Sequence, residues 1–429
     1  MISKTIDNEI KVKEAVEITP AYPWYVLGVL TLVYLLNFLD RSLIYILFTP
    51  IKKEMALSDL QLAVLGTTAF VIFYTFLGIP FGMLADRVVR KNMITIGLVV
   101  WSLFSGLTGF ADGFWTIFFC RVMVGIGEAT LGPAALSLLS DYFPTRMRAT
   151  VQAIYSAGIP LGSGVAFFLG GWIGQTMSWR WAFYLLGFPG LLVAVLVYLL
   201  KEPVRGRTEV VKDHYRNKDW KKLLQSTPLR FHNLGYALFA VAANSVTIWG
   251  PLFLSRIHGL SLASIGLIAG ILSAIGGMPG TILGGYIADW CRRKGGSGGR
   301  MMFTAMAALS CIPLWFILLY STNSILLIVA GFLLLAAGLM WLGPAAADVH
   351  EIAGPQLRGI GIGIYFFTIN IIGYGIGPPI IGRFNDWLGV SSNPTLMRYS
   401  LLICPLACLV SALMLWLGSG KLAQQDTNK

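Results

Sequence analysis

Long runs of apolar residues, separated by short polar connections, fill almost the whole chain. Twelve runs can be counted, near residues 24–50, 60–84, 92–111, 114–141, 149–175, 181–200, 230–255, 262–288, 301–320, 324–347, 358–386 and 399–418. About 20 apolar residues are needed for a helix to cross a bilayer. The pattern therefore predicts an all-α integral membrane protein with twelve transmembrane helices.

The longest polar stretch divides these runs into two sets of six. We expect the chain to consist of a tail (1–21), a first six-helix bundle (22–200), a linker (201–228), a second six-helix bundle (229–419) and a tail (420–429). Lysine and arginine concentrate in the linker and in the loops on its side of the membrane. The positive-inside rule then predicts that both termini are cytoplasmic.

The composition agrees with a membrane protein. The 429 residues are 56% hydrophobic and 12% charged, whereas soluble domains carry about 25% charged residues. The formal net charge of +12 is spread over short loops, so we expect no nucleic-acid partner. The first apolar run is too long for the core of a signal peptide, so it should remain as the first helix.

Charged residues inside two of the runs are the strongest functional signal. The stretch Phe119–Pro144 holds Arg121 and Glu128, seven residues apart on nearly one helical face, and the first run holds Asp40 and Arg41. Intramembrane charges normally face a bundle interior or a water-filled cavity and mark transport pathways. The alternative is a structural ion pair that ties helices together.

A short motif occurs once in each half. Gly82-Met-Leu-Ala-Asp86-Arg87-Val-Val-Arg90-Lys91 follows the second run, and Gly285-Tyr-Ile-Ala-Asp289-Trp-Cys-Arg292-Arg293-Lys294 follows the eighth. Such duplication is typical of transporters built from parallel repeats, with the substrate site between the halves. We expect Asp86, Arg87, Arg90, Asp289 and Arg292 to act in gating; the alternative is an ordinary basic loop.

Twelve spans, two halves and the G-x-x-x-D-R-x-x-R-K loop resemble the major facilitator superfamily over nearly the whole chain. Several stretches are similar to the spinster-like transporters of that superfamily, namely Asn37-Phe-Leu-Asp40-Arg41, Gly125-Ile-Gly-Glu128, Ile159-Pro-Leu-Gly-Ser-Gly164, Gly343-Pro344, Asn370…Gly373 and Gly375…Gly377-Pro378. Organic-anion symporters share the Asp-Arg and Arg…Glu pairs. The eighth-helix motif departs from the usual Asp-Arg at Trp290, which weakens the expected cytoplasmic clasp.

The resemblance implies that Asp40 and Glu128 carry protons as the coupling ion. Burial raises the pKa of a carboxylate and a nearby guanidinium lowers it, so this cluster can change protonation when a cavity opens or an anion binds. Arg41 and Arg121 either contact an anionic substrate, through the planar fork of the guanidinium, or serve only as counter-ions.

The second half offers neutral polar and aromatic groups at mid-depth. We expect Asn244, Trp249, Tyr365 and Asn370 to contact substrate together with the two arginines. A sugar acid would leave many polar groups unsatisfied against this half, so an amphipathic anion fits better. The spinster-like resemblance likewise implies lysophospholipids or phosphorylated sphingoid bases. A proton-coupled symporter of a sugar acid or another small organic anion is the alternative.

Other function classes find less support. No G-x-x-x-x-G-K-[ST] stretch is present, which excludes an ATP-driven pump, and no nucleophile–base arrangement suggests an enzyme. A receptor or channel would need neither a duplicated gate nor paired intramembrane charges. The five cysteines and four histidines show no metal-ligand spacing, so we expect packing cysteines, no disulfide, no metal and no cofactor. We expect a monomer in a bacterial inner membrane.

Overall fold

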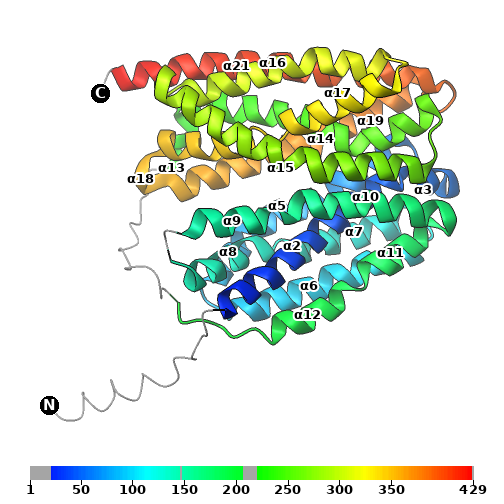
Figure 1. The fold of residues 1–429 in the computed structure, drawn as a ribbon, viewed down its shortest axis with the longest axis horizontal. Coiled ribbons are helices and arrows are strands. Elements are labelled where there is room, and N and C mark those ends of the chain that lie inside the picture. Colours follow the sequence, from blue (N-terminus) through cyan, green and yellow to red (C-terminus); the bar gives the residue numbers. More distant parts are fainter. Residues whose placement is uncertain (1–20, 145–146, 206–219, 428–429) are drawn as a thin grey trace, which may run out of the picture.

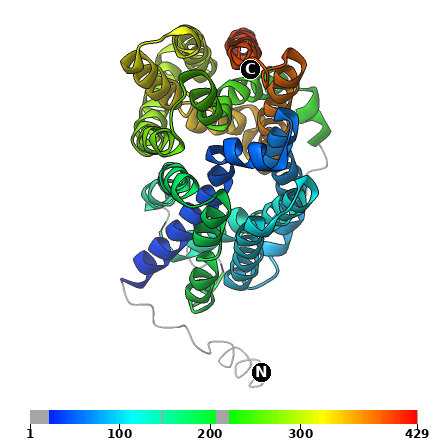
Figure 2. The same cartoon turned by 90° about the vertical axis from the view of Figure 1, so that its right-hand side faces the viewer.

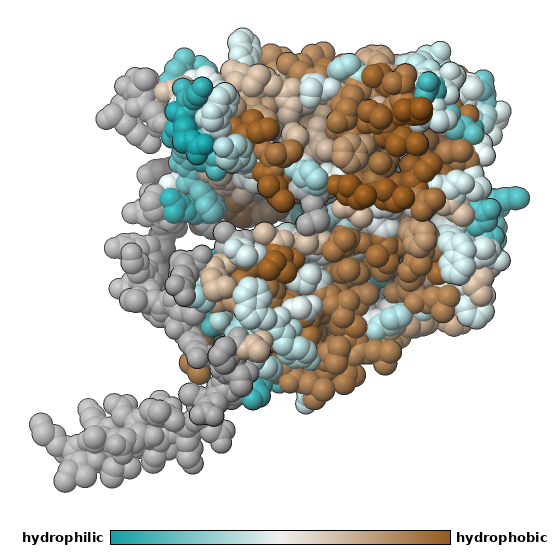
Figure 3. Space-filling model, in the orientation of Figure 1, coloured by the Kyte–Doolittle hydropathy of each residue, from teal (hydrophilic) through white to brown (hydrophobic). Residues whose placement is uncertain are grey.

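The computed structural model describes residues 21–144, 147–205 and 220–427, and the regular structure in these ranges is entirely helical. Twelve described helices are long and apolar enough to cross a bilayer, which confirms the predicted number. They form two bundles, one above the other in Figure 1. Hydrophobic residues cover the middle of the molecule, and polar residues collect toward its two ends (Figure 3).

The first bundle contains six spans and one short connecting helix. Its elements are α2 (Tyr22–Ile46), α3 (Phe48–Met55), α4 (Asp59–Ala63), η1 (Val64–Thr68), α5 (Ala69–Ala85), α6 (Arg90–Leu107), η2 (Thr108–Phe110), α7 (Phe114–Glu128), α8 (Leu131–Tyr142), α9 (Arg148–Ser156), α10 (Gly158–Thr176), α11 (Trp179–Gly187) and α12 (Gly190–Tyr198). Several spans are thus interrupted. The span predicted at 114–141 breaks after Glu128, because Pro133 has no N–H for a fourth-neighbour hydrogen bond.

The second bundle has longer, less interrupted helices. Its elements are α13 (Trp220–Gln225), α14 (Thr227–His258), α15 (Leu262–Gly295), α16 (Gly299–Tyr320), α17 (Ser324–Ala337), α18 (Leu342–Ile369), η4 (Asn370–Ile376), α19 (Gly377–Leu388), η5 (Pro394–Leu396), α20 (Met397–Ser400) and α21 (Ile403–Thr427). A left-handed residue, Gly354 (φ 67°), turns the chain inside α18 and separates the tenth span from the eleventh. Because α21 continues to Thr427, residues 420–427 are helical where a tail was predicted.

Both π-helical segments lie where the bundles face each other. The segment η1 interrupts the second span and η4 interrupts the eleventh, and the two are in contact. Thr68 Oγ1 donates a hydrogen bond to the carbonyl of Gly375 across this contact, at 2.8 Å. Single turns of π-helix are frequent at functional sites, so the geometry singles out the centre of the molecule.

Two ends of the molecule can be distinguished. We call the end at which α2 and α14 begin the linker side, since residues 201–205 leave the first bundle there (Figure 1). We call the opposite end, which carries α3, the far side. The positive-inside pattern predicts that the linker side is cytoplasmic.

The bundles pack closely along one helix pair and on the far side. Helix α10 runs along α15, and α4 packs against α19. A Cβ atom at Gly266 would lie 2.4 Å from the Phe167 carbonyl, so only glycine permits this approach of α10 and α15. Figure 2, viewed from the far side, shows the two bundles one above the other, and Figure 3 shows a hollow between them on the linker side.

Glycines in the eleventh span behave unequally. Gly373 and Gly377 lie against Ala240 and Val241 of α14, as a close-packing role predicts. Gly359 and Gly363 have no atom within 4 Å of a Cβ position. Close packing therefore explains only part of this glycine-rich span.

Candidate functional site

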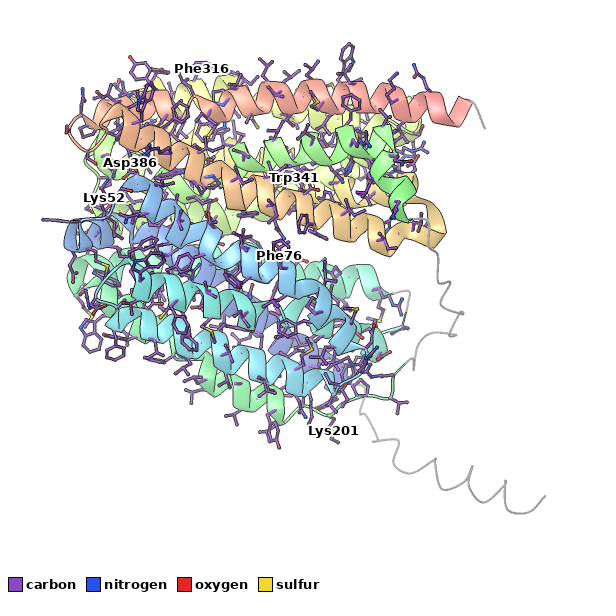
Figure 4. All side chains as sticks on the ribbon, turned by 180° about the vertical axis from the view of Figure 1, so that it is seen from behind. Lys52, Phe76, Lys201, Phe316, Trp341 and Asp386 are labelled. Atoms are coloured by element: carbon purple, nitrogen blue, oxygen red, sulfur yellow. The ribbon has the colours of Figure 1, made fainter. Side chains whose placement is uncertain are left out.

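A cavity of about 280 Å³ lies between the bundles at mid-span. Its wall on the first bundle includes Arg41 among the aromatic rings of Tyr34, Phe38, Phe70 and Tyr74. The second bundle contributes Asn244, Trp341, Asn370 and Tyr374. In Figure 4, Trp341 lies where the two bundles face each other. The wall is therefore mostly aromatic, with one cation on one side and neutral amides on the other.

Arg41 is the charged group of this wall. Its Nε donates to the Glu128 carboxylate, Oε2, at 2.6 Å, and its side chain keeps 20% of its surface exposed. The guanidinium carbon lies 4.5 to 5.0 Å from the ring centroids of Phe38, Phe70 and Tyr74. Aromatic faces stabilise a cation electrostatically, so this pocket holds the guanidinium in place and leaves part of it open to the cavity.

Glu128 lies behind Arg41 and has no exposed side-chain surface. It is the last residue of α7, directly before the break that Pro133 imposes. A buried carboxylate is costly unless it is paired and hydrogen-bonded. Oε2 has Arg41, whereas Oε1 has no hydrogen-bond partner among the described residues. Only one of the two Glu128 carboxylate oxygens therefore has a hydrogen-bond partner in the described part of the chain, which suits a group that changes its protonation state.

Asp40 and Arg121 belong to the same region but do not line the cavity. The Asp40 carboxylate accepts a hydrogen bond from Ser105 of α6, at 2.7 Å. Arg121 is 1% exposed and donates to the backbone carbonyls of Leu65 and Asp40, at 3.3 and 3.4 Å. The predicted grouping of four charges is present, but Glu128 pairs with Arg41 of another helix and not with Arg121 of its own.

The residues expected to contact substrate separate into two groups. Arg41, Asn244 and Asn370 line the cavity, whereas Arg121 does not. Trp249 and Tyr365 do not line it either and are buried in the second bundle, at 0% and 1% exposure. Both residues lie at a depth along their spans that suited a substrate contact, but neither side chain lies on the cavity side of its helix. Trp341 and Tyr374 take their place in the aromatic wall.

The two loop motifs lie on the linker side, and each is paired within its own bundle. Arg90 is 1% exposed and binds Asp141 and Glu202, at 2.5 and 2.7 Å. Asp86 and Arg87 are exposed. The Asp86 carboxylate forms no ion pair with any of the described residues. The described part of the chain thus contains no ionic clasp between the bundles on this side.

The corresponding charges of the second bundle form one network. Arg300 contacts Asp289 at 2.8 Å and Glu351 at 3.1 Å, and Arg292 contacts Glu351 at 2.7 Å. Asp348 is fully buried, with Arg300 at 3.8 Å. These contacts tie the ends of three neighbouring spans together.

The far side carries a clasp between the bundles that sequence reasoning missed. Arg256 of α14 binds the Asp59 carboxylate through two nitrogens, at 2.5 and 2.8 Å. Asp386 of α19 accepts hydrogen bonds from the backbone N–H groups of Asp59 and Leu60 at the start of α4, at 2.8 and 2.9 Å. Lys52 also binds Asp59. Figure 4 shows Lys52 and Asp386 at the same end of the molecule.

The described residues offer no metal site. They contain no group of three or more histidine, cysteine, aspartate or glutamate side chains placed to hold an ion. All five cysteines are free, and Cys120, Cys311, Cys404 and Cys408 are buried, in agreement with a packing role. His232 is buried too, its ring nitrogens occupied by Asn233 and a backbone carbonyl. His214 lies outside the described residues.

Known proteins with similar sequences are membrane transporters. The chain is 28% identical to an MFS-type efflux pump of Mycolicibacterium smegmatis, with 94% of each chain covered. It is 25% identical to the sphingosine-1-phosphate transporter SPNS2 of Xenopus tropicalis, covering 94% of this chain and 82% of that one. It is also 27% identical to the hexuronate transporter of Bacillus subtilis, covering 86% and 89%.

A solved structure agrees with the fold. The crystal structure of a bacterial homologue of the lysosomal transporter spinster, in an inward-facing and unoccupied conformation, has a TM-score of 0.84 at 25% identity and covers 95% of this chain and 99% of that one. The sequence profile of the Major Facilitator Superfamily matches residues 30–378. Bacterial relatives agree with the predicted inner membrane. The chain belongs to the Major Facilitator Superfamily and is a multi-pass membrane transporter that resembles the spinster proteins.

Proposed function

We propose that the chain is a proton-coupled transporter of an amphipathic anion, such as a lysophospholipid or a sphingolipid-like phosphate, and that it works by alternating access. The observation that carries this proposal is the pair of Arg41 and Glu128. One partner is open to the cavity and the other is wholly buried behind it. An anion in the cavity and the Glu128 carboxylate compete for the same guanidinium.

Competition for Arg41 links anion binding to protonation. A guanidinium close to a carboxylate favours its charged form, and a nearby anion disfavours it. When an anion binds Arg41, the charged form of Glu128 loses part of its stabilisation and meets a second negative charge, so protonation becomes easier. Anion and proton then occupy the site together, and the linkage favours their movement in one direction.

Asp40 is the second candidate proton carrier. Its carboxylate is 2% exposed and accepts one hydrogen bond from Ser105. It is one residue from Arg41 on α2, so a rotation of that helix would change its surroundings together with those of Arg41. Arg121, which donates to the backbone carbonyls of Leu65 and Asp40, acts in this proposal as a positioning residue and not as a substrate contact.

The wall of the cavity favours an amphipathic substrate. Beyond Arg41, it presents mainly aromatic and aliphatic side chains, with the amides of Asn244 and Asn370 on the second bundle. A sugar acid carries hydroxyl groups on all sides, and each one left without a partner is costly. A molecule with one anionic head and an apolar body leaves fewer groups unsatisfied. The relative that transports sphingosine-1-phosphate supports this reading.

A sugar acid is the second candidate substrate. The similarity to a hexuronate transporter, which covers most of both chains, is the observation in its favour. The same cation and the same acids would bind its carboxylate. The two candidates differ in what the second bundle must provide, namely apolar surface for the first and hydrogen-bond partners for the second.

The clasp on the far side indicates which conformation of the transport cycle the structure represents in this proposal. With Asp59, Arg256 and Asp386 engaged, the bundles are held together on that side, and the hollow lies on the linker side. If the linker side is cytoplasmic, this is an inward-facing state. Release of the clasp and closure of the two loop motifs, through Asp86, Arg87, Arg90, Asp289 and Arg292, would expose Arg41 to the other face.

Uptake into proteoliposomes tests the proposal. Purified protein is reconstituted, a pH gradient is imposed, and uptake of a lysophospholipid is compared with uptake of a hexuronate. Glu128→Gln and Arg41→Ala are compared with Asp112→Asn and Arg383→Ala, which change one exposed carboxylate and one exposed arginine outside the cavity. We expect gradient-driven lysophospholipid uptake by wild type and both controls, and none by either site variant.

Two outcomes would contradict the proposal. Gradient-driven uptake of the hexuronate alone would assign the second candidate substrate. Uptake by Glu128→Gln that follows the gradient as in wild type would remove Glu128 from the coupling step.

A further inference from the structure

A second cavity, of about 490 Å³, lies inside the far-side half of the second bundle. It is lined by α14, α15, α16 and α17, and α10 of the first bundle contributes Phe167. Most lining side chains are aliphatic or aromatic, Trp315 and Leu318 among them, and the polar ones are serines, threonines and His258. Acidic side chains, lysine and arginine are missing from this wall. We call this space the apolar compartment.

The apolar compartment adjoins the central cavity. Thr247, Ser273 and Leu335 line both spaces. The two spaces therefore share part of their walls, and a molecule held at Arg41 would lie next to the apolar compartment. A cation in one space and an apolar wall in the adjoining one match the anionic head and the apolar chain of a single-chain amphiphile.

We propose that the apolar compartment binds the alkyl chain of the transported amphiphile while Arg41 binds its anionic head. This inference rests on the proposed function and adds a measurable property to it. Burying one methylene group raises affinity about fourfold. Affinity therefore increases with chain length until the compartment is full, and the length at which it stops increasing measures the space available.

One glycine allows the space to be changed without disturbing the fold. A Cβ atom at Gly331, on α17, would meet only Leu272 Cδ1 within 4 Å, at an ordinary contact distance of 3.5 Å. A leucine at this position projects four carbons into the compartment. Gly28, on α2, is the matched control, because it is exposed, lines neither cavity and has no atom within 4 Å of a Cβ.

The experiment measures binding of n-alkyl phosphates of increasing length to the full chain in nanodiscs by titration calorimetry. Because the head group is constant and partition into the bilayer is the same for all variants, differences between variants report on the protein. We expect wild type and Gly28→Leu to gain about fourfold per methylene up to one shared optimum. Gly331→Leu should reach its optimum about four methylenes earlier, with short-chain affinity unchanged.

A second measurement locates the chain directly. Alkyl phosphates that carry a nitroxide at the chain end should quench the fluorescence of Trp315, which is 2% exposed and lines the compartment. The contribution of Trp315 is the quenching measured in wild type minus the quenching measured in Trp315→Phe. Absence of that difference, or an unchanged optimum in Gly331→Leu, would overturn the inference.

The results separate this inference from the proposed function. If Arg41→Ala abolishes binding of every alkyl phosphate but Gly331→Leu keeps the wild-type optimum, the chain lies elsewhere and the proposed function stands. If Arg41→Ala binds as wild type does, the head-group site is wrong and both proposals fail. Binding of a hexuronate that is equal in wild type and Gly331→Leu, with no binding of alkyl phosphates, contradicts both in favour of the sugar-acid alternative.

Discussion

Replacing Glu128 by glutamine should make anion binding tighter while it abolishes coupling. The amide keeps an oxygen that can accept the hydrogen bond from Arg41 Nε, now 2.6 Å from the carboxylate, so the local geometry is preserved. What disappears is the negative charge. Glutamine therefore mimics the protonated state of Glu128 at every pH.

The magnitude follows from the geometry. An anion bound to the terminal nitrogens of Arg41 would lie about 6 Å from the Glu128 carboxylate, since each charge-assisted hydrogen bond adds about 2.8 Å. Two charges at this distance interact by about 3 kcal/mol at an effective dielectric constant of about 20, which corresponds to about 100-fold in affinity. Wild type should lose this factor as rising pH ionises Glu128, and Glu128→Gln should not.

The assay is titration calorimetry with a medium-chain alkyl phosphate, on protein in nanodiscs, across a range of pH. We expect the affinity of Glu128→Gln to equal that of wild type at low pH and to exceed it by about 100-fold at high pH. Asp112→Asn, which removes an exposed carboxylate from the connection between α6 and α7, should follow wild type. An affinity for Glu128→Gln that is no higher than wild type at high pH would refute the reasoning.

Three further changes test other parts of the structure. Asp386→Asn removes the charge that caps α4 and should shift the bundles toward the state open on the far side by at least about tenfold, since a charged hydrogen bond contributes about 1.5 to 3 kcal/mol. Spin-label distances across the far side measure the shift. Gly266→Leu should prevent close packing of α10 and α15 and lower the yield of folded protein on size-exclusion chromatography, whereas Gly28→Leu should not. Asp40→Asn can keep the hydrogen bond from Ser105, so it should fold normally and lose pH-driven uptake; uptake that still follows the gradient would exclude Asp40 as a proton carrier.

The sequence was sufficient for the spans and for the region of the site. Hydropathy alone defines a membrane span, because every backbone group in a bilayer must be satisfied within a helix. The cost of intramembrane charges then identified Asp40, Arg41, Arg121 and Glu128 as neighbours. Their partners did not follow, because spacing within one helix gives a face and says nothing of the helix opposite. The pairing of Glu128 with Arg41 depends on how the first bundle as a whole places α2 relative to α7.

The remaining differences have similar causes. Trp249 and Tyr365 were placed by depth along their spans, but depth does not determine on which side of the helix a ring lies. The far-side clasp was missed because Asp59 and Asp386 are 327 residues apart and each looks like an ordinary charge at a helix end. Only the stacking of the two bundles brings them together.

Proton movement caused by the substrate tests the central claim most directly. Proteoliposomes that contain a pH-sensitive dye are clamped at zero membrane potential, without an imposed pH gradient, and a lysophospholipid is added outside. Wild type should acidify the interior as the anion enters, and Glu128→Gln should not, although it binds the anion more tightly. Anion uptake by wild type without acidification, or equal acidification by Glu128→Gln, would contradict the proposed coupling of Arg41 and Glu128.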